Sequence, residues 1–452
     1  MRRVRKITIR YYRLLSVLFV VLILFSAANA SAVDTPDKPT PDKTISEGEY
    51  LTLDNCIEIA LKQQPSLMSS LYQIQVYEAQ VGQAHSGFYP TLDLQGGYTR
   101  NQLVNNYHLG PNPPPSSIIN KDDYYGSLQL SQMIYDFGKT RTNVNMRKYY
   151  LLASKKDYET QTNTTAYNVK VSYYGVVKAR KARDVDADTV SKYERQLERA
   201  KDFFKVGTKA LYDVTQAEVN LSSAKISLMN SENALAVAWD NLTTTMGIVF
   251  SSEFKIDEDI NPKPLGIKFE DALSSAYNNR PDLMSAMAAK DAAQINIEYA
   301  KKDNFPVVSG TASYNFDDGR FPLNNGWIAG VVMKWNIFSG FNTKFKVAEA
   351  RASKDAAETK IQSLKLSIYS GVKQSYLNLN LAGDMIPASE LQVKLAMENL
   401  DIVTLKYEAG LASPVDYTDA VVQYKSAKLT YINALYNYKT AEAAILWAMG
   451  SR

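Results

Sequence analysis

The residue types that most often carry chemistry in proteins are scarce in this chain. Its 452 residues include one cysteine, Cys56, and two histidines, His85 and His108. A single cysteine excludes an internal disulfide and a paired-cysteine metal or redox site. The sequence also lacks the phosphate-binding loop, the HExxH zinc motif and the dinucleotide-binding glycine pattern. We therefore expect no enzyme, with no catalytic residue, no cofactor and no resident metal.

One acidic spacing imitates a calcium-binding loop. Asp184, Asp186 and Asp188 alternate along the chain as the first ligands of such a loop do. Thr189 stands where the loop needs glycine, and Arg195 stands where it needs a bidentate glutamate. The spacing therefore predicts no calcium site.

A second acidic segment begins with a pattern typical of a helix start. Ser413 can cap a helix, Pro414 suits its first position and Asp416 suits its first turn, with Asp419 about one turn on. Asp213 occupies the corresponding place earlier in the chain. Helix capping alone would explain Asp213 and Asp416, and a role at an opening is the alternative for Asp416 and Asp419.

The first thirty residues predict a secretory signal peptide. Residues 2–13 carry six basic side chains and no acidic one, residues 14–27 are apolar, and an Ala-Asn-Ala sequence at 28–30 offers a cleavage site. An uncleaved anchor is the alternative, but it needs about 17–25 apolar residues. Residues 31–49 predict a flexible lead-in, rich in proline and charged residues.

The charge of the mature chain gives no reason to expect a nucleic-acid partner. Loss of the six basic residues with the signal peptide turns the formal net charge from +4 to −2. The remaining basic run, residues 178–183, is typical of a solvated helix face.

The rest of the chain is a duplication. Phe204-Lys-Val-Gly207 and Tyr407-Glu-Ala-Gly410 stand 203 residues apart, and each is followed six residues later by an aspartate. We expect a first structural repeat at 50–250, a linker at 251–266 and a second repeat at 267–450. The first repeat is 13 residues longer before its second strand, so we expect a long loop at 101–123.

Each repeat contains two segments that alternate apolar and polar residues as a half-buried strand does. They lie at about 89–100 and 124–135, and at about 305–317 and 326–338. Such strands suit a soluble sheet or a membrane barrel, and a mean hydropathy of −0.27 argues only against transmembrane helices. Four strands cannot close a barrel, so a barrel would need several identical copies.

Long helical hairpins follow the strands, at about 138–247 and 341–449. The second helix of each hairpin places its seam residues at alternating spacings of four and three, as in a coiled coil. The seam residues are Ala217, Leu221, Ala224, Leu228, Ser231, Leu235, Ala238 and Leu242, and Ala420, Tyr424, Ala427, Tyr431, Ala434, Tyr438, Ala441 and Ile445. We expect these tyrosines to serve packing, and we expect a kink near Gly383 and Pro387.

These features together resemble the TolC family of outer-membrane efflux and secretion channels. The resemblance rests on the openings that end at Pro65 and Pro281, the strand starts at Tyr89-Pro90 and Phe305-Pro306, and the glycine tips. It implies a mainly α protein with membrane β-strands. A homotrimer would close a twelve-stranded β-barrel in the outer membrane of a Gram-negative bacterium and a long periplasmic α-barrel.

The resemblance also implies a function and its partners. The trimer would be the passive exit duct of a tripartite efflux pump or a type I secretion system, opened at its periplasmic tip by a docking adaptor. The partners would be outer-membrane lipid, a periplasmic adaptor (a membrane fusion protein) and, through it, an inner-membrane pump or secretion ATPase. The exported substrate, whether drug, metal or protein, is not indicated.

The family likeness assigns roles to residues at the two tips. Asp416, Asp419 and Tyr407 would form the periplasmic aperture, although Ala412 stands where relatives carry a basic residue that latches the closed tips. Asp213 and Ser413 would cap helices. The adaptor contacts would be Gly207, Thr208, Lys209 and Ala210 in the first tip, and Gly410, Leu411, Ala412 and Ser413 in the second.

Two other classes of protein fit parts of the pattern. One is a soluble periplasmic coiled-coil scaffold or adaptor in which the strands form a small sheet. The other is an adhesin-like surface fibre. Both predict recovery in soluble or shed fractions, whereas a channel predicts recovery in the outer membrane.

Overall fold

The computed structural model describes residues 49–105, 117–248, 254–257, 262, 265–319 and 323–451. The chain divides into two units, Met1–Thr44 and Ile45–Arg452, and the described residues all belong to the second. The predicted signal peptide, the lead-in as far as residue 48 and much of the predicted linker lie outside the described residues.

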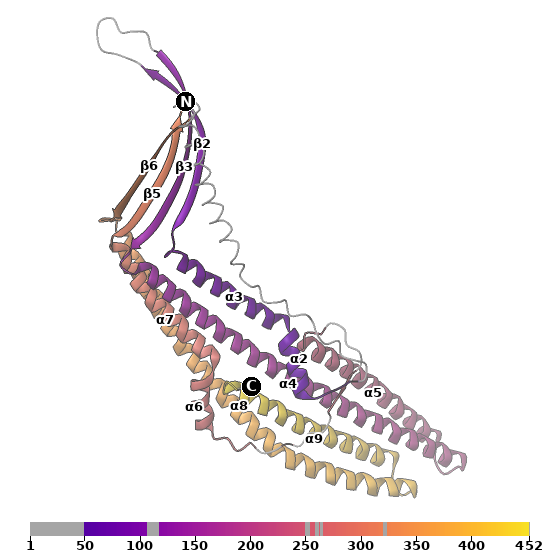
Figure 1. Ribbon diagram of the computed structural model, residues 1–452. Coiled ribbons are helices and arrows are strands. Elements are labelled where there is room, and N and C mark those ends of the chain that lie inside the picture. Colours follow the sequence, from indigo (N-terminus) through magenta and orange to yellow (C-terminus); the bar gives the residue numbers. More distant parts are fainter. Residues whose placement is uncertain are drawn as a thin grey trace. The chain divides into compact units, whose positions relative to one another are not determined.

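The same series of elements occurs twice along the second unit (Figure 1). The first series is α2 (Leu53–Gln63), α3 (Pro65–Ser86), β2 (Thr91–Asn105), β3 (Ser117–Tyr135), α4 (Lys139–Lys205) and α5 (Leu211–Thr245). The second series is α6 (Phe269–Asn279), α7 (Pro281–Lys301), a short 3-10 helix η1 (Lys302–Asn304), β5 (Val307–Asp318), β6 (Asn324–Lys334), α8 (Asn342–Glu408) and α9 (Pro414–Ala448). Pro65 and Pro281 each occupy the first position of a helix, where a missing N–H costs nothing.

The four long strands form one antiparallel sheet in the order β2-β3-β5-β6. The prediction of a long loop at 101–123 is wrong, because β2 continues to Asn105 and β3 begins at Ser117. Polar residues sustain this extension: Arg100 pairs with Asp122 across the ladder, and its Nε lies 3.7 Å from the Asp122 carboxylate. Charged cross-strand pairs stabilise a ladder much as apolar pairs do.

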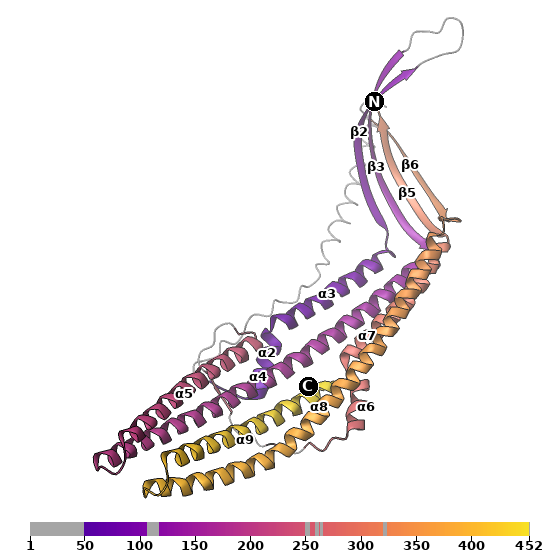
Figure 2. The same cartoon turned by 180° about the vertical axis from the view of Figure 1, so that it is seen from behind.

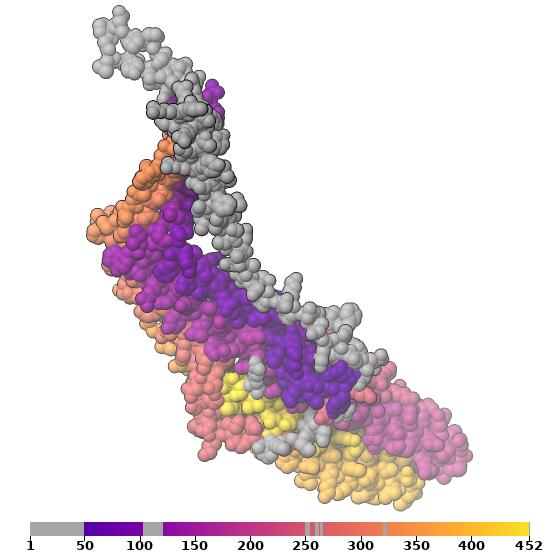
Figure 3. Space-filling view, in the orientation of Figure 1, coloured from indigo at the N-terminus to yellow at the C-terminus, as the bar shows by residue number. Residues whose placement is uncertain are grey.

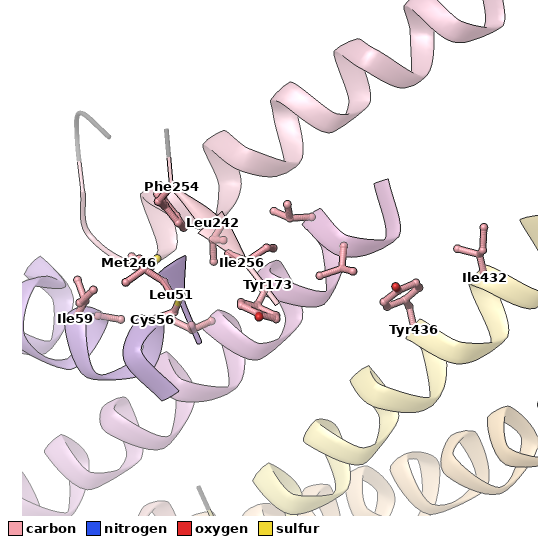
Figure 4. Packing of buried hydrophobic residues seen from close by; sticks show 14 of the residues in the cluster. Leu51, Cys56, Ile59, Tyr173, Leu242, Met246, Phe254, Ile256, Ile432 and Tyr436 are labelled. Carbon is pink, nitrogen blue, oxygen red and sulfur yellow. The ribbon is translucent and has the colours of Figure 1, made fainter. Parts of the chain in front are cut away.

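Two very short strands were not predicted from the sequence. β1 (Tyr50–Leu51) pairs in parallel with β4 (Lys255–Ile256), which lies inside the predicted linker. Leu51 and Ile256 are buried in a core cluster with Cys56, Tyr173 and other residues from α2, α4, α5 and α9 (Figure 4). This core ties the start of the first repeat to the segment that leaves it. Two-residue strands carry no periodic signal that a sequence could reveal.

The strand-to-helix turns use a left-handed backbone in both repeats. Phe137 and Gly138 have positive φ before α4, as do Gly340 and Phe341 before α8. Before α4, the Asp136 carboxylate accepts hydrogen bonds from the N–H groups of Gly138 (2.9 Å) and Thr140 (2.6 Å). These bonds satisfy N–H groups in the first turn that have no partner within the helix.

One carboxylate joins the two points at which α4 and α8 leave the sheet. Asp303 in η1 lies 2.6 Å from Lys139 Nζ at the start of α4 and 2.8 Å from Lys346 Nζ at the start of α8. Although burial opposes ionisation of Asp303, its hydrogen bonds from both lysines lower its pKa below the ordinary value. The first turns of α4 and α8 are thereby held together where they leave the sheet.

The helices pair as two antiparallel hairpins, α4 with α5 and α8 with α9, and α4 also packs against α9 (Figure 2). α4 and α8 have 67 residues each, which corresponds to about 100 Å of helix. Among the helices of the described ranges, none is both long enough and apolar enough to cross a membrane. Pro387 lies inside α8 without ending it, and α8 bends part-way along in both ribbon views.

The predicted seams are confirmed as the buried faces of α5 and α9. Ala217, Ala224 and Leu242 are buried in α5, and Ala420, Ala427, Ala434, Tyr438, Ala441 and Ile445 are buried in α9. The expected solvation of the basic run at 178–183 is wrong, since its basic residues are half-buried. Arg180, for example, lies 5.5 Å from the centre of the Trp239 ring on α5.

Candidate functional site at the helical tips

The two tips share one backbone design. Gly207 follows α4 with φ of 75°, and the N–H groups of Gly207 and Thr208 bond to the carbonyl oxygens of Phe204 (3.0 Å) and Phe203 (2.9 Å). Gly410 follows α8 with φ of 76° and starts the same pair of bonds. This pattern is the Schellman motif, which needs a left-handed residue and therefore favours glycine.

α9 begins with a complete capping box. Ser413 Oγ accepts the N–H of Asp416 at 3.1 Å, and the Asp416 carboxylate accepts the N–H of Ser413 at 2.9 Å and its Oγ–H at 2.8 Å. The hydrogen bonds from the side chain and backbone of Ser413 lower the pKa of Asp416. The carboxylate is thus ionised and ordered, and its residue remains exposed.

α5 begins differently, and the predicted cap at Asp213 is wrong. The N-cap is Ala210, which has no side-chain acceptor, and Asp213 is the third residue of the helix. Asp213 can act on α5 only through its charge near the positive end of the helix dipole. Similar sequence spacing after the two glycines therefore produces a full capping box in one tip and none in the other.

The three predicted aperture residues differ in how far they are exposed to solvent. Asp416 and Asp419 are exposed, whereas Tyr407 is only 4% exposed. Burial, with a smaller contribution from the Asp213 charge, raises the pKa of Tyr407. Tyr407 lies inside the protein between helices, so it does not border an opening in the single chain.

Among the predicted adaptor contacts, most are accessible. Gly207, Thr208, Ala210, Gly410, Leu411 and Ser413 are exposed, and Lys209 is half-buried. Ala412 is buried beside Tyr407 and Tyr417, so its side chain cannot meet a partner. Four further exposed apolar residues lie next to the turns and were not predicted as contacts: Val206, Leu211, Tyr212 and Val415. Each is an apolar residue that lies beside a turn and outside the heptad seam, and this feature could have identified it from the sequence.

The remaining chemically notable residues have structural roles. Burial raises the pKa of Cys56, which is fully buried, to about 12, so its thiol stays protonated. Asp186 pairs with Lys425, and Asp188 pairs with Lys192. Within the described ranges, no three His, Cys, Asp or Glu side chains gather closely enough to hold a metal ion. His108 lies outside those ranges.

Comparison with known protein families decides the identity of this architecture. The model of the family described as outer membrane efflux protein matches residues 56–248 and 272–451, one segment in each half of the chain. The chain belongs to the outer membrane efflux protein family. This membership places it in the outer membrane as an efflux channel protein, in agreement with the resemblance, and it argues against a soluble scaffold and a surface fibre.

Individual relatives agree with the family assignment. The outer membrane protein TolC of Escherichia coli (strain K12) is 25% identical over 417 residues, covering 86% of this chain and 80% of the relative. The outer membrane efflux protein BepC of Brucella suis is 22% identical and covers 88% and 85%. The crystal structure of the Campylobacter jejuni CmeC outer membrane channel superposes with a TM-score of 0.74 at 19% identity, over 88% of this chain and 85% of that one.

For a member of this efflux family, the exposed side chains of the sheet are informative. Trp327, Ile328, Val331 and Met333 on β6 are each at least 63% exposed in the single chain. Exposed aromatic residues gather where the sheet meets the helices: Tyr89, Tyr135, Trp335, Phe338 and Phe341. Membrane-spanning sheets show this combination of an apolar band with aromatic residues at its edge.

Proposed function

We propose that three copies of this chain form an outer-membrane channel that serves as the passive exit duct of a tripartite efflux pump or a type I secretion system. The observation that carries the proposal is the sheet with two free edges. Within the described residues, β2 and β6 each pair with one strand only. An open edge in lipid leaves backbone groups without partners, at a cost of several kcal/mol each. Joining β6 of one copy to β2 of the next removes both edges.

Three copies of a four-stranded sheet would give a twelve-stranded barrel. Trp327, Val331 and Met333 share one face of β6 and would then face lipid, and the aromatic residues at the sheet–helix junction would lie at the membrane surface. Cyclic closure with identical interfaces is the usual way in which equal subunits end their own assembly. The family membership supports this use of the strands over a soluble sheet.

The long helices offer a second surface for assembly. α8 carries a stripe of apolar residues that the chain itself leaves uncovered: Leu377, Leu381, Leu391, Leu395, Ile402 and Leu405, each more than half exposed. α5 carries exposed Val219, Ile226 and Val237. Large apolar stripes are rarely left in water. We assign these stripes to contacts between α8 of one copy and α5 of its neighbour, which would extend the barrel as a helical tube.

The tips are the proposed docking and gating region. Exposed Gly207, Thr208, Leu411 and Ser413 would contact a periplasmic adaptor, which would link the channel to an inner-membrane pump or secretion ATPase. Three copies would bring six carboxylates, from Asp416 and Asp419, around the aperture. A ring of carboxylates in a narrow opening favours cations.

A planar lipid bilayer tests the channel directly. We expect the purified, detergent-extracted protein to run as a trimer and to produce discrete conductance steps that multivalent cations block. Asp416→Asn combined with Asp419→Asn should weaken the cation block, because the neutral ring no longer binds them. Asp355→Asn is the control, since this carboxylate is 72% exposed on α8 far from the tip. A protein without conductance contradicts the channel, and an unchanged block in the double variant contradicts the aperture role.

A further inference from the structure

We infer that Gly97 keeps the outer mouth of the duct clear, because it leaves room for the ring of Tyr125 to lie flat against the luminal wall. Gly97 is on β2, and Tyr125 is its cross-strand partner on β3. The inference rests on the proposed function, since the wall is luminal only in a closed barrel. Gly97 acts through Tyr125 and is therefore a positioning residue of the export path.

The register of the sheet decides which of its two faces carries Tyr125. Residues directly opposite one another across a ladder share a face, and neighbours along a strand alternate between faces. One row across the four strands is apolar and consists of Leu94, Leu128, Tyr314 and Trp327. The next row is polar and consists of Gln95, Ser127, Asn315 and Gly326. Tyr125 is two residues from Ser127, so it belongs to the polar face, which a membrane barrel turns toward its lumen.

Tyr125 also lies at the outer end of the sheet. Gly97, Tyr125, Asp317 and Asn324 form the last row that spans all four strands, at the end away from the helices. In Figure 3 the sheet extends beyond the helices, with the orange surface of β5 and β6 beside the purple surface of the first repeat. With the helices in the periplasm, this end is the extracellular mouth. The other aromatic residues of the four strands share the opposite face: Tyr98, Tyr124, Tyr135, Tyr314, Phe316 and Trp327.

The ring of Tyr125 occupies the space on the luminal side of Gly97. A Cβ built on Gly97 would lie 2.5 Å from Cζ and 2.8 Å from Cε1 of this ring, closer than a Cβ can approach. The ring therefore lies along the wall over β2. Within the described residues the Tyr125 hydroxyl forms no hydrogen bond, so packing on the glycine places the ring. Aromatic rings that cover a cross-strand glycine are a recurrent stabilising device in sheets.

A side chain at position 97 would move the ring into the lumen. The atoms that it would meet belong to the far end of a side chain that can rotate, so the ring moves and the strand ladder remains. On its other side Tyr125 has the exposed carboxylate of Asp317 directly opposite on β5. The electron-rich face of a ring does not rest favourably on a carboxylate. In a trimer, three displaced rings would project across the mouth.

Labelling of a luminal thiol from outside the cell tests this role of Gly97. Gln129→Cys places the thiol on the polar face four residues deeper than Tyr125, about 14 Å along the strand. The native Cys56 is fully buried and stays unlabelled. In outer-membrane vesicles that carry this background, Gly97→Val should slow labelling by a bulky polymer-linked maleimide several-fold and leave labelling by a small maleimide unchanged. Gly97→Ala adds only the clashing Cβ and should act in the same direction.

The matched control adds the same side chain to the other face. A Cβ on Gly96 would meet no atom closer than 3.7 Å, so Gly96→Val should leave both labelling rates unchanged. Combining Gly97→Val with Tyr125→Ala should restore labelling by the bulky reagent, because no ring remains to be displaced.

Two outcomes would overturn the role of Gly97. One is unchanged labelling by the bulky reagent in both Gly97 variants. The other is slow labelling that persists after Tyr125→Ala, because the ring would then not be the obstruction. If even the small reagent fails to reach the thiol in the Gln129→Cys background, the polar face does not line an open duct. That result contradicts the proposed function itself.

Discussion

At the scale of single residues, four glycines in matching positions have two different reasons to be glycine. Gly207 and Gly410 lie in the tip turns. Gly247 and Gly450, here called the closing glycines, follow the C-terminal ends of α5 and α9. All four have φ between 75° and 83°. A Cβ on Gly207 or Gly410 would meet nothing within 4 Å. A Cβ on Gly247 would lie 2.9 Å from the Gln63 carbonyl oxygen, and one on Gly450 would lie 2.8 Å from the Asn279 carbonyl carbon. The closing glycines thus also permit a close backbone contact.

This difference predicts unequal costs for the same substitution. Gly207→Ala and Gly410→Ala should each cost the left-handed strain alone, about 1–2 kcal/mol. Gly247→Ala and Gly450→Ala add a clash with backbone that cannot rotate away, so their thermal unfolding midpoints should fall clearly further. The comparison is made by circular dichroism on the detergent-extracted protein. Equal midpoints for the tip and closing variants would show that the close contact has no energetic weight.

At the scale of elements, the pairing of α4 with α9 joins the two hairpins along their length. Ile432 and Tyr436 of α9 contribute to the core that contains Tyr173 and Val185 of α4. Nearer the tip, Lys425 Nζ lies 2.6 Å from the Asp186 carboxylate, with side chains only 25% and 11% exposed. A buried ion pair adds little net stability but is costly to break on one side. An arrangement of α4 and α9 that leaves either charge unpaired is therefore disfavoured.

The ion pair between α4 and α9 makes a measurable prediction. Lys425→Met alone leaves the Asp186 carboxylate buried without its partner and should lower the free energy of unfolding by about 3–5 kcal/mol. Combining it with Asp186→Leu should recover most of that loss, because an apolar pair replaces the ions. Lys394→Met, on an exposed position of α8, is the control and should be near neutral. If the double variant is no more stable than Lys425→Met, the pair is not the reason for the loss.

At the scale of the whole molecule, the described part of the single chain leaves two kinds of surface uncovered. These are the strand edges of β2 and β6 and the apolar stripe of α8. The stripe is opposite Leu400, which faces the chain's own core at 4% exposed. One helix thus has an apolar face toward its own chain and a second one away from it, as expected of a helix packed on two sides.

A charge on the outer stripe should disrupt assembly without unfolding the helices. Leu395→Asp would bury a carboxylate in an apolar contact between copies, where desolvation is strongly unfavourable. We expect the detergent-extracted variant to elute as a monomer in light scattering while its circular dichroism stays helical. Glu390→Lys, an exposed polar position on the same helix, should remain trimeric. A trimeric Leu395→Asp protein would place the contact between copies elsewhere.

The sequence by itself was sufficient for the duplication, the glycine tips and the seam positions, which depend on repetition and on local periodicity. The alternating spacing of four and three identified the buried faces of α5 and α9, and Tyr438 is indeed a packing residue whose hydroxyl accepts the N–H of Leu265 at 3.0 Å. The glycine tips and the Ser413 cap followed from short-range rules of backbone geometry. Such features are determined within a few residues of chain, so a sequence pattern contains them.

Only the tertiary structure decided which element covers each face. The spacing that includes Tyr407 does not reveal that Phe203, some 200 residues earlier, lies against its ring, or that Ala412 is buried beside it. The 13 extra residues of the first repeat suggested a loop, because the cross-strand partners that extend β2 and β3 were not visible in the pattern. Contacts between distant segments depend on the sum of many weak packing terms. A local pattern therefore identifies a surface but not the partner that buries it.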